Sequence, residues 1–262
     1  MGGAVRAVSL QSDFAAIARE GGRAALVTVL QGAVPGTRML VRPDGAQEGS
    51  LGDAELDGAA LAAAEDLLWA ERSETLQVGD TLLFVDVTHP SPRLIVFGAV
   101  DYSAWLATLA KVTGWRAYVV DPRGRFATRE RFPDAEDVLV AWPGKAFEQL
   151  GGIDKATYIA VLTHDPKLDD AALEIALRSD AAYVGAMGSR RAQEARRERL
   201  IALGMTEEEM GRLAAPIGLD LGALTAEETA LSVMAEVVAV RNGRRGGRLS
   251  EASGGRIHEV GA

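Results

Sequence analysis

The hydrophobic pattern of the chain changes character after about the first ninety residues. Apolar or β-branched runs at residues 24–30 and 37–42 are separated by glycine and proline and predict two strands with a tight turn. Residues 51–74 are rich in Ala, Leu and Glu with leucines spaced for one apolar stripe, which predicts a helix, and residues 81–87 return to strand composition. The first part is therefore expected to be a small β-β-α-β module of the α+β class.

The remainder alternates between short apolar runs and segments with helical spacing. The apolar runs predict five strands, at residues 94–98, 116–120, 138–141, 157–163 and 182–187. Strands of this kind, joined by crossover helices, predict a parallel sheet covered on both faces. The expected fold class is α/β, with a doubly wound, Rossmann-like sheet domain preceded by the smaller domain.

Two prolines, a helix-capping motif and a change of composition predict the domain organisation. Residues 88–93 contain two prolines, which disfavour helix and remove backbone donors, so we place a boundary there between a small domain at 1–90 and a Rossmann-like domain at 91–242. Thr225 and Glu228 form a capping-box signature that opens a last helix. Residues 243–262 are rich in Gly, Arg and Ser without an apolar stripe and predict a flexible tail.

Composition then excludes several classes of protein. Of 262 residues, 48% are hydrophobic and 25% charged, as in globular domains. A net charge of −9 argues against non-specific nucleic-acid binding. The absence of cysteine excludes disulfides, thiolate nucleophiles and Cys-ligated metals, and fits a reducing cytoplasm. We find no signal peptide and no apolar run of about 18 residues, so we expect a cytoplasmic protein without a membrane span.

Polar residues follow every predicted strand of the parallel sheet. Ligands of such sheets bind outside the carboxyl ends of the strands, so these loops are expected to form a shared cleft, although loops are also polar simply because they are solvated. No catalytic residue or metal ligand set is predicted, because the few histidines lack zinc-site spacing. The candidate binding residues are Gly98, Asp101, Asp121, Arg123, His164, Asp165, Gly188, Ser189, Arg190 and Arg191.

The loop after the last predicted strand is the best anion site. Ser189 is expected to cap a helix at residues 194–203, and its free N–H groups together with Arg190 and Arg191 would hold a phosphate or another oxyanion. The alternative is a capped helix with solvated arginines. His164 could exchange a hydrogen bond with an oxyanion or a pterin heteroatom, or could cap the next helix.

A nicotinamide dinucleotide is the competing ligand. The fingerprint G-x-G-x-x-G would need glycine where the first loop has Val100 and Ser103, and the valine side chain would obstruct the pyrophosphate. Asp121, at the end of the second strand of this sheet, stands where a carboxylate would bind a ribose, but an aspartate before proline is also common turn structure. An NAD(P)-dependent oxidoreductase stays open as the alternative.

Four segments carry a resemblance to a known family. Residues 121–132 (Asp-Pro-Arg, Phe-Ala, Glu-Arg-Phe), 163–169 (Thr-His-Asp, Leu-Asp), 183–191 (Tyr-Val-Gly-Ala-Met-Gly-Ser-Arg-Arg) and 216–228 (Pro-Ile-Gly-Leu-Asp-Leu-Gly-Ala, Thr, Glu-Glu) resemble the XdhC/CoxI family. Its members are accessory factors that mature molybdenum hydroxylases such as xanthine dehydrogenase and carbon monoxide dehydrogenase. Residues 35–45 resemble the smaller domain that precedes the Rossmann-like domain in this family.

The resemblance implies a function that the residues alone do not. A family member would bind the molybdenum cofactor (molybdopterin), protect it, and hand it to a client hydroxylase, with a cysteine desulfurase as a further partner. Fold-level analogy, rather than the resemblance, suggests a homodimer. This chain departs from the family at residues 49–55, which lack the cysteine that members often have there, and at Val100-Asp101, where relatives tend to have Gly-His. A scaffold that binds only a protein partner is the third alternative.

Overall fold

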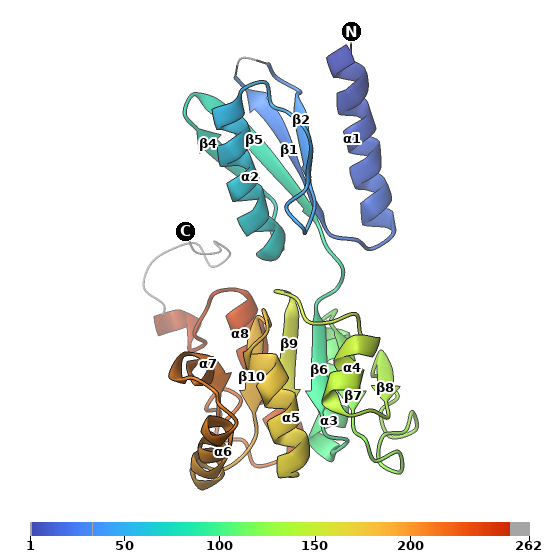
Figure 1. Ribbon diagram of the computed structural model, residues 1–262, viewed down its shortest axis with the longest axis vertical. Coiled ribbons are helices and arrows are strands. Elements are labelled where there is room, and N and C mark those ends of the chain that lie inside the picture. The colour runs from blue at the N-terminus through green and yellow to red at the C-terminus, as the bar shows by residue number, and fades with distance from the viewer. Residues whose placement is uncertain (1, 33, 252–262) are drawn as a thin grey trace. The chain divides into compact units, whose positions relative to one another are not determined.

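The protein is described by a computed structural model, which covers residues 2–32 and 34–251 (Figure 1). The chain divides into two compact units between Ser91 and Pro92. The second unit contains a parallel sheet covered by helices, which confirms the predicted Rossmann-like α/β class. Each unit is described separately below.

The first unit is an antiparallel five-stranded sheet with the strand order β3-β2-β1-β5-β4. Alternate residues of the central strand β1 face opposite ways: Val27 packs in the cluster around helix α2, and Leu26 in the cluster around helix α1. The elements are α1 (Gly2–Arg19), β1 (Ala24–Gln31), β2 (Arg38–Val41), β3 (Gln47–Gly49), α2 (Ala54–Trp69), β4 (Glu74–Val78) and β5 (Thr81–Thr88).

The predicted β-β-α-β module was incomplete, because α1, β3 and β4 were missed. The strands β3 and β4 lie at the two edges of the sheet and contain no fully buried residue, so their sequences lack the apolar run by which strands were recognised. Helix α2 is shorter than the predicted 51–74. The Asp53 carboxylate caps it by accepting from the N–H groups of Glu55 and Leu56, and the chain leaves the helix before Glu71, which has a φ of 54°.

The second unit is a six-stranded parallel sheet with the order β11-β10-β9-β6-β7-β8. Helices α3 and α8 pack on one face through Leu94 and Val96, and α4, α5 and α6 pack on the other through Ile95 and Phe97 (Figure 1). The elements are β6 (Arg93–Phe97), α3 (Asp101–Val112), β7 (Arg116–Val120), β8 (Asp137–Leu139), α4 (Pro143–Gln149), β9 (Thr157–Val161), α5 (Pro166–Leu177), β10 (Tyr183–Ala186), α6 (Arg190–Ala202), α7 (Glu207–Gly211), β11 (Leu213–Ala214), α8 (Ala226–Arg241) and the 3₁₀ helix η1 (Leu249–Glu251).

Three details of this unit differ from the sequence prediction. The connection from β7 to β8 is a series of turns rather than a helix, and Phe132 of this connection is buried in the core cluster that includes residues of α3 and α8. The short strand β11 was missed. Helix α6 begins at Arg190 rather than at 194, because the Ser189 side chain caps it there and its polar first turn has no apolar stripe to recognise.

The chain after α8 is described only in part. The predicted tail begins at residue 243, the helix η1 lies within it, and residues 252–262 fall outside the described residues. In the described part of the chain, no helix has both the length and the apolar character that crossing a bilayer requires.

Candidate functional site

The carboxyl ends of the parallel strands converge where the strand order reverses. The chain leaves β6 towards β7 and β8 on one side, and later returns to β9 on the other side of β6. The loops after β6 and β9 therefore begin next to each other, which is where open α/β sheets bind their ligands. All ten candidate residues lie in the loops or first helical turns at this edge of the sheet.

Gly98 brings the two central loops into close approach. Its φ is +111°, and a Cβ atom built on it would stand 2.9 Å from the backbone nitrogen of Thr163. The Ser103 hydroxyl donates to the Gly98 carbonyl oxygen at 2.6 Å and closes the first turn, so serine is accommodated at the third position of the dinucleotide fingerprint. Val100, at the second position, stands as the N-cap residue of α3, and its side chain is part-exposed. The loop is thus a tight turn with a branched residue at the second fingerprint position, and the Val100 side chain packs partly against the core cluster that includes residues of α3 and α8.

Asp121 is fully buried and its carboxylate is saturated with hydrogen bonds. Oδ2 accepts from the Ala99 backbone N–H at 3.0 Å and from the Arg123 guanidinium at 2.8 Å, and Oδ1 accepts from the Arg123 backbone and side chain, both at 2.9 Å. Burial acts to raise the pKa of Asp121, but these hydrogen bonds outweigh burial and leave the pKa below its ordinary value. Asp121 holds the first loop in place and has no oxygen without a partner for a ribose hydroxyl.

A basic cluster surrounds Phe126 on this side of the site. The guanidinium groups of Arg123 and Arg125 lie 4.8 and 4.5 Å from the centre of its ring. Arg131 donates to the Ala99 carbonyl oxygen at 3.1 Å and forms an ion pair of 3.3 Å with Asp101, the exposed first residue of α3. Asp101 and Arg123 are therefore both paired with neighbouring charges.

The loop after β9 carries the imidazole of His164. The Thr163 hydroxyl accepts from the Asp165 backbone N–H at 2.9 Å, and the Asp165 carboxylate caps α5 by accepting from the Lys167 N–H at 3.0 Å. Asp165 thus does the capping that was one possibility for His164. The His164 side chain is exposed and forms no hydrogen bond or ion pair among the described residues. The charge of Asp165 also contributes to a raised pKa of Arg123, whose main cause is its hydrogen bond to Asp121, so the loops after β7 and β9 are electrostatically linked.

The loop after β10 forms an open helix N-terminus. The Ser189 hydroxyl accepts from the Ala192 N–H at 3.3 Å, and Gly188 has a φ of +141°. Arg190 and Arg191 occupy the first turn of α6, are exposed, and form no ion pair within the described part of the chain. The remaining free N–H groups of the first turn and two unneutralised guanidinium groups suit an anionic ligand.

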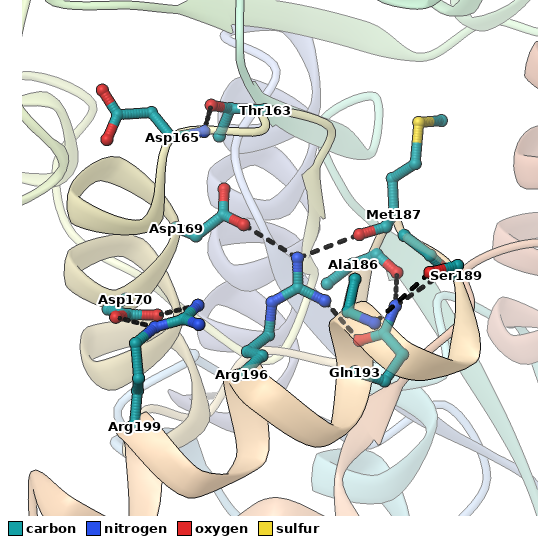
Figure 2. Close-up of polar contacts among 12 residues, drawn as sticks. Thr163, Asp165, Asp169, Asp170, Ala186, Met187, Ser189, Gln193, Arg196 and Arg199 are labelled. Atoms are coloured by element: carbon teal, nitrogen blue, oxygen red, sulfur yellow. Dashed lines mark hydrogen bonds and ion pairs between the residues drawn. The ribbon is translucent and has the colours of Figure 1, made fainter.

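Beneath this loop lies a buried network that the sequence analysis missed. Figure 2 shows Arg196 of α6 reaching both α5 and the loop: it donates to Asp169 Oδ2 at 2.8 Å and to the Met187 carbonyl oxygen at 2.9 Å, and it also contacts Gln193. Gln193 in turn donates to the Gly188 carbonyl oxygen at 3.1 Å. The side chains of Asp169 and Arg196 are each only 5% exposed. These groups fix the loop on which the anion site depends.

A signal for this pair was present in the sequence. Arg196 stands four residues before the buried Leu200, and Asp169 stands four before the buried Leu173, so both occupy core-facing positions of their helices. A charged residue at such a position needs a partner. What the sequence could not show is which acid and which base would meet.

A third loop completes this side of the edge. Ile217 donates its backbone N–H to the Ala186 carbonyl oxygen at 3.1 Å, which seats the segment after β11 beside the end of β10. Glu236 of α8 accepts from the Gly218 backbone N–H at 2.8 Å and from the Tyr183 hydroxyl. Burial, and then the hydrogen bond to Glu236, raise the pKa of Tyr183, so the hydroxyl stays protonated and serves as an anchor.

The chemistry of the edge suits an anionic, heterocyclic ligand better than a metal ion. Among the described residues, no three histidine, aspartate or glutamate side chains gather as a metal site would require. Cationic groups with free N–H donors stand beside the buried network after β10, and the unpaired imidazole of His164 stands after β9. These residues fit the molybdenum cofactor, because its terminal phosphate matches the cationic groups and N–H donors after β10, and its pterin heteroatoms match the imidazole after β9.

Comparison with known proteins agrees with this fold. A family model described as the XdhC Rossmann domain matches residues 94–237, and one described as the XdhC and CoxI family matches residues 17–79. A crystal structure of a xanthine dehydrogenase from Bacillus halodurans is similar with a TM-score of 0.63 and 22% identity, covering 89% of this chain and 66% of that one. At this identity the structural likeness concerns the fold alone.

Three curated proteins are similar in sequence. The Uncharacterized protein YqeB of Escherichia coli K12 is 31% identical over 183 residues, 70% of this chain and 33% of its own length. A probable xanthine dehydrogenase subunit of Bacillus subtilis 168 is 30% identical over 161 residues, 62% of this chain and 46% of its own length. The Molybdenum cofactor insertion chaperone PaoD of Escherichia coli K12 is 31% identical over 153 residues, 58% of this chain and 41% of its own length. The matches thus span less than half of each relative.

Proposed function

The chain belongs to the XdhC and CoxI family, and from this premise we propose that it is a maturation factor that binds the molybdenum cofactor and delivers it to a molybdenum hydroxylase. The relative PaoD, named as a cofactor insertion chaperone, supports the role. The relative named as a probable xanthine dehydrogenase component supports the class of client. When bound, the cofactor would supply redox chemistry to the client enzyme, while this chain binds and orients it.

One observation carries the proposal: Arg190 and Arg191, at the N-terminus of α6, form no ion pair with any residue that the structure describes. Most other arginines of this edge are paired, Arg123 with Asp121, Arg131 with Asp101, and Arg196 with Asp169. Two such cations beside the N–H groups that the Ser189 cap leaves free favour a phosphate, and the cofactor ends in one. His164 would face the ligand from the neighbouring loop.

The test is the pterin content of the purified protein. The chain is produced in a host that makes the cofactor, the bound pterin is oxidised, and its fluorescence is compared with protein concentration. We expect near-stoichiometric pterin in the unmodified chain and at least about tenfold less in the double variant Arg190→Ala/Arg191→Ala, since each lost charge-assisted hydrogen bond costs about 1.5–3 kcal/mol. The double variant Arg197→Ala/Arg199→Ala removes two charges from the C-terminal half of the same helix, away from the proposed phosphate site, and should retain the pterin.

Two results would contradict the proposal. The first is an unmodified chain without pterin at any meaningful fraction of the protein. The second is a thermal shift with NAD(H) or NADP(H), which would favour the oxidoreductase alternative. Against that alternative stand Val100 in the first loop and the full engagement of both Asp121 oxygens.

A further inference from the structure

One oxygen of a buried carboxylate beside the site has no partner. Asp169 Oδ2 accepts from Arg196 at 2.8 Å, whereas Oδ1, although shielded from solvent, has no hydrogen-bond partner in the part of the chain that the structure describes. Buried carboxylate oxygens are normally satisfied, because leaving one unpaired forfeits its hydration without compensation. Arg196 Nε is likewise buried without a hydrogen-bond partner among the described residues, and Arg196 does not turn it to Oδ1, so Oδ1 still lacks a donor.

Asp170, the next residue of α5, shows that the geometry of α5 and α6 does not by itself leave a carboxylate oxygen unpaired. Asp170 uses both oxygens: Oδ2 accepts from Arg199 Nε at 2.7 Å and Oδ1 from Arg199 Nη2 at 3.0 Å (Figure 2). Arg196 could engage Asp169 in the same two-pronged way, but it is drawn towards the Met187 carbonyl oxygen and Gln193. Asp169 Oδ1 is left open because Arg196 is used to hold the loop.

Asp169 Oδ1 is placed at the proposed site. Figure 2 shows it directed towards the loop that bears Thr163 and Asp165, and the Asp169 backbone N–H donates to the Asp165 carbonyl oxygen at 2.9 Å. The Arg196 group that binds Oδ2 also binds the carbonyl oxygen of Met187, next to Gly188. His164, on the same loop, is exposed, and its side chain forms no hydrogen bond or ion pair with the described residues.

We propose that Asp169 is a ligand-binding residue whose Oδ1 accepts an N–H donor from the pterin ring of the cofactor. The inference rests on the proposed function and adds an orientation to it. A pterin ring carries an amino group and a ring N–H, whereas a phosphate offers acceptors only, so a carboxylate attracts the ring and repels the phosphate. The ring would lie over Asp169 and the phosphate at Arg190 and Arg191.

The electrostatics of Asp169 agree with this assignment. Burial raises the pKa of Asp169, and the hydrogen bond and charge of Arg196 act against burial. A second donor on the free oxygen would stabilise the carboxylate further and offset the cost of burying it. A ligand with an N–H group would therefore complete the network.

The decisive variant is Asp169→Asn, with Asp170→Asn as its matched control. At position 169 the amide oxygen would turn to Arg196, which only donates, and the NH₂ group would occupy the place of Oδ1, presenting a donor where the ring needs an acceptor. Asp170→Asn changes the same functional group one residue away, at a pair without an open oxygen. The probes are neopterin, a pterin without phosphate, titrated by fluorescence, and pyrophosphate, titrated by calorimetry.

The expected result separates a binding role from a structural one. Asp169→Asn should weaken neopterin binding at least about tenfold and leave pyrophosphate binding unchanged, and Asp170→Asn should alter neither. Equal neopterin affinity in the unmodified chain and Asp169→Asn overturns the inference, as does a loss of both ligands together. If the unmodified chain holds pterin from its host but Asp169→Asn holds as much, only this inference fails. If the unmodified chain binds no pterin at all, the proposed function fails with it.

Discussion

Two buried carboxylates serve opposite halves of the same sheet edge, and they solve the problem of burial differently. Asp121, after β7, has both oxygens fully engaged by Ala99 and Arg123 and a lowered pKa. Asp169, on α5, has one oxygen engaged and a raised pKa. The Asp121 carboxylate is fully hydrogen-bonded and supports the structure, whereas the Asp169 carboxylate can still accept one more hydrogen bond. A buried carboxylate oxygen without a partner is typical of a binding site and uncommon at a purely structural position.

The largest effect is expected from removing the cation of the incomplete pair. Arg196→Met would leave Asp169 buried without its charge partner, which should lower the free energy of unfolding by about 3–5 kcal/mol in urea denaturation. The matched control is Arg199→Met, at the more exposed pair with Asp170, which should cost within about 1 kcal/mol. Equal costs for the two substitutions would show that the buried pair contributes no more than the surface pair.

The next effect concerns the complete half. Asp121→Ala removes the acceptor of the Ala99 N–H and frees the guanidinium of Arg123, whose side chain is 42% exposed and can turn to water. We expect a loss of about 2–3 kcal/mol in the free energy of unfolding, measured in the same way. Asp165→Ala, which removes only a helix cap, should cost about 1 kcal/mol. A smaller loss for Asp121→Ala than for Asp165→Ala would contradict the supporting role.

A pH series sharpens the comparison, because the two groups should respond with opposite signs. The lowered pKa of Asp121 means that its stabilising contribution is present above the ordinary carboxyl value of about 3.9 and is lost as pH falls through the native pKa. The raised pKa of Asp169 means that its contribution is fullest below that value and is lost as pH rises through the native pKa. From pH 3 to 7, the cost of Asp121→Asn should therefore grow and that of Asp169→Asn should shrink. Parallel slopes in urea titrations would contradict the contrast.

The smallest effect on stability is expected at the exposed arginines. Arg190→Ala/Arg191→Ala removes side chains that form no ion pair within residues 2–32 and 34–251, so the free energy of unfolding should change by no more than about 0.5 kcal/mol. The same variant is expected to lose most of its bound pterin. A thermal melt recorded beside the pterin assay would expose any loss of pterin that comes from unfolding instead.

The sequence predicted most of what repeating patterns determine. The buried strands of the parallel sheet, the Ser189 cap and the Thr225 capping box all follow from apolar runs and local hydrogen-bond chemistry, and the structure confirms them. The edge strands β3 and β4 and the helix α1 were missed. The exposed strands have little apolar signal, and the stripe of α1 faces β1 through Leu10 and Phe14, a contact that pattern alone does not specify.

The sequence predicted which loops meet at the edge of the sheet, but it did not predict the buried Asp169–Arg196 pair beside them. Parallel topology is enough to gather Gly98, Asp121, His164 and Ser189 at one end of the sheet. The partnership of Asp169 with Arg196 joins residues 27 positions apart. Arg196, Arg197 and Arg199 lie close together in α6, and only the packing of the helices determines that Arg196 is the buried one. Pairing of this kind is a property of the tertiary structure.

The packing of α3 against α8 also bears on how the protein is made. Residues 101–112 pack against β6 and β7 as well, but the part of their apolar side that faces α8 is covered only when residues 226–241 have been made, so more than a hundred residues must leave the ribosome in between. The first unit, by contrast, has its last strand as soon as Thr88 has emerged. Nascent chains of this protein should therefore pass through a long interval with one finished unit and one exposing hydrophobic surface, the period in which a folding helper would have most to protect.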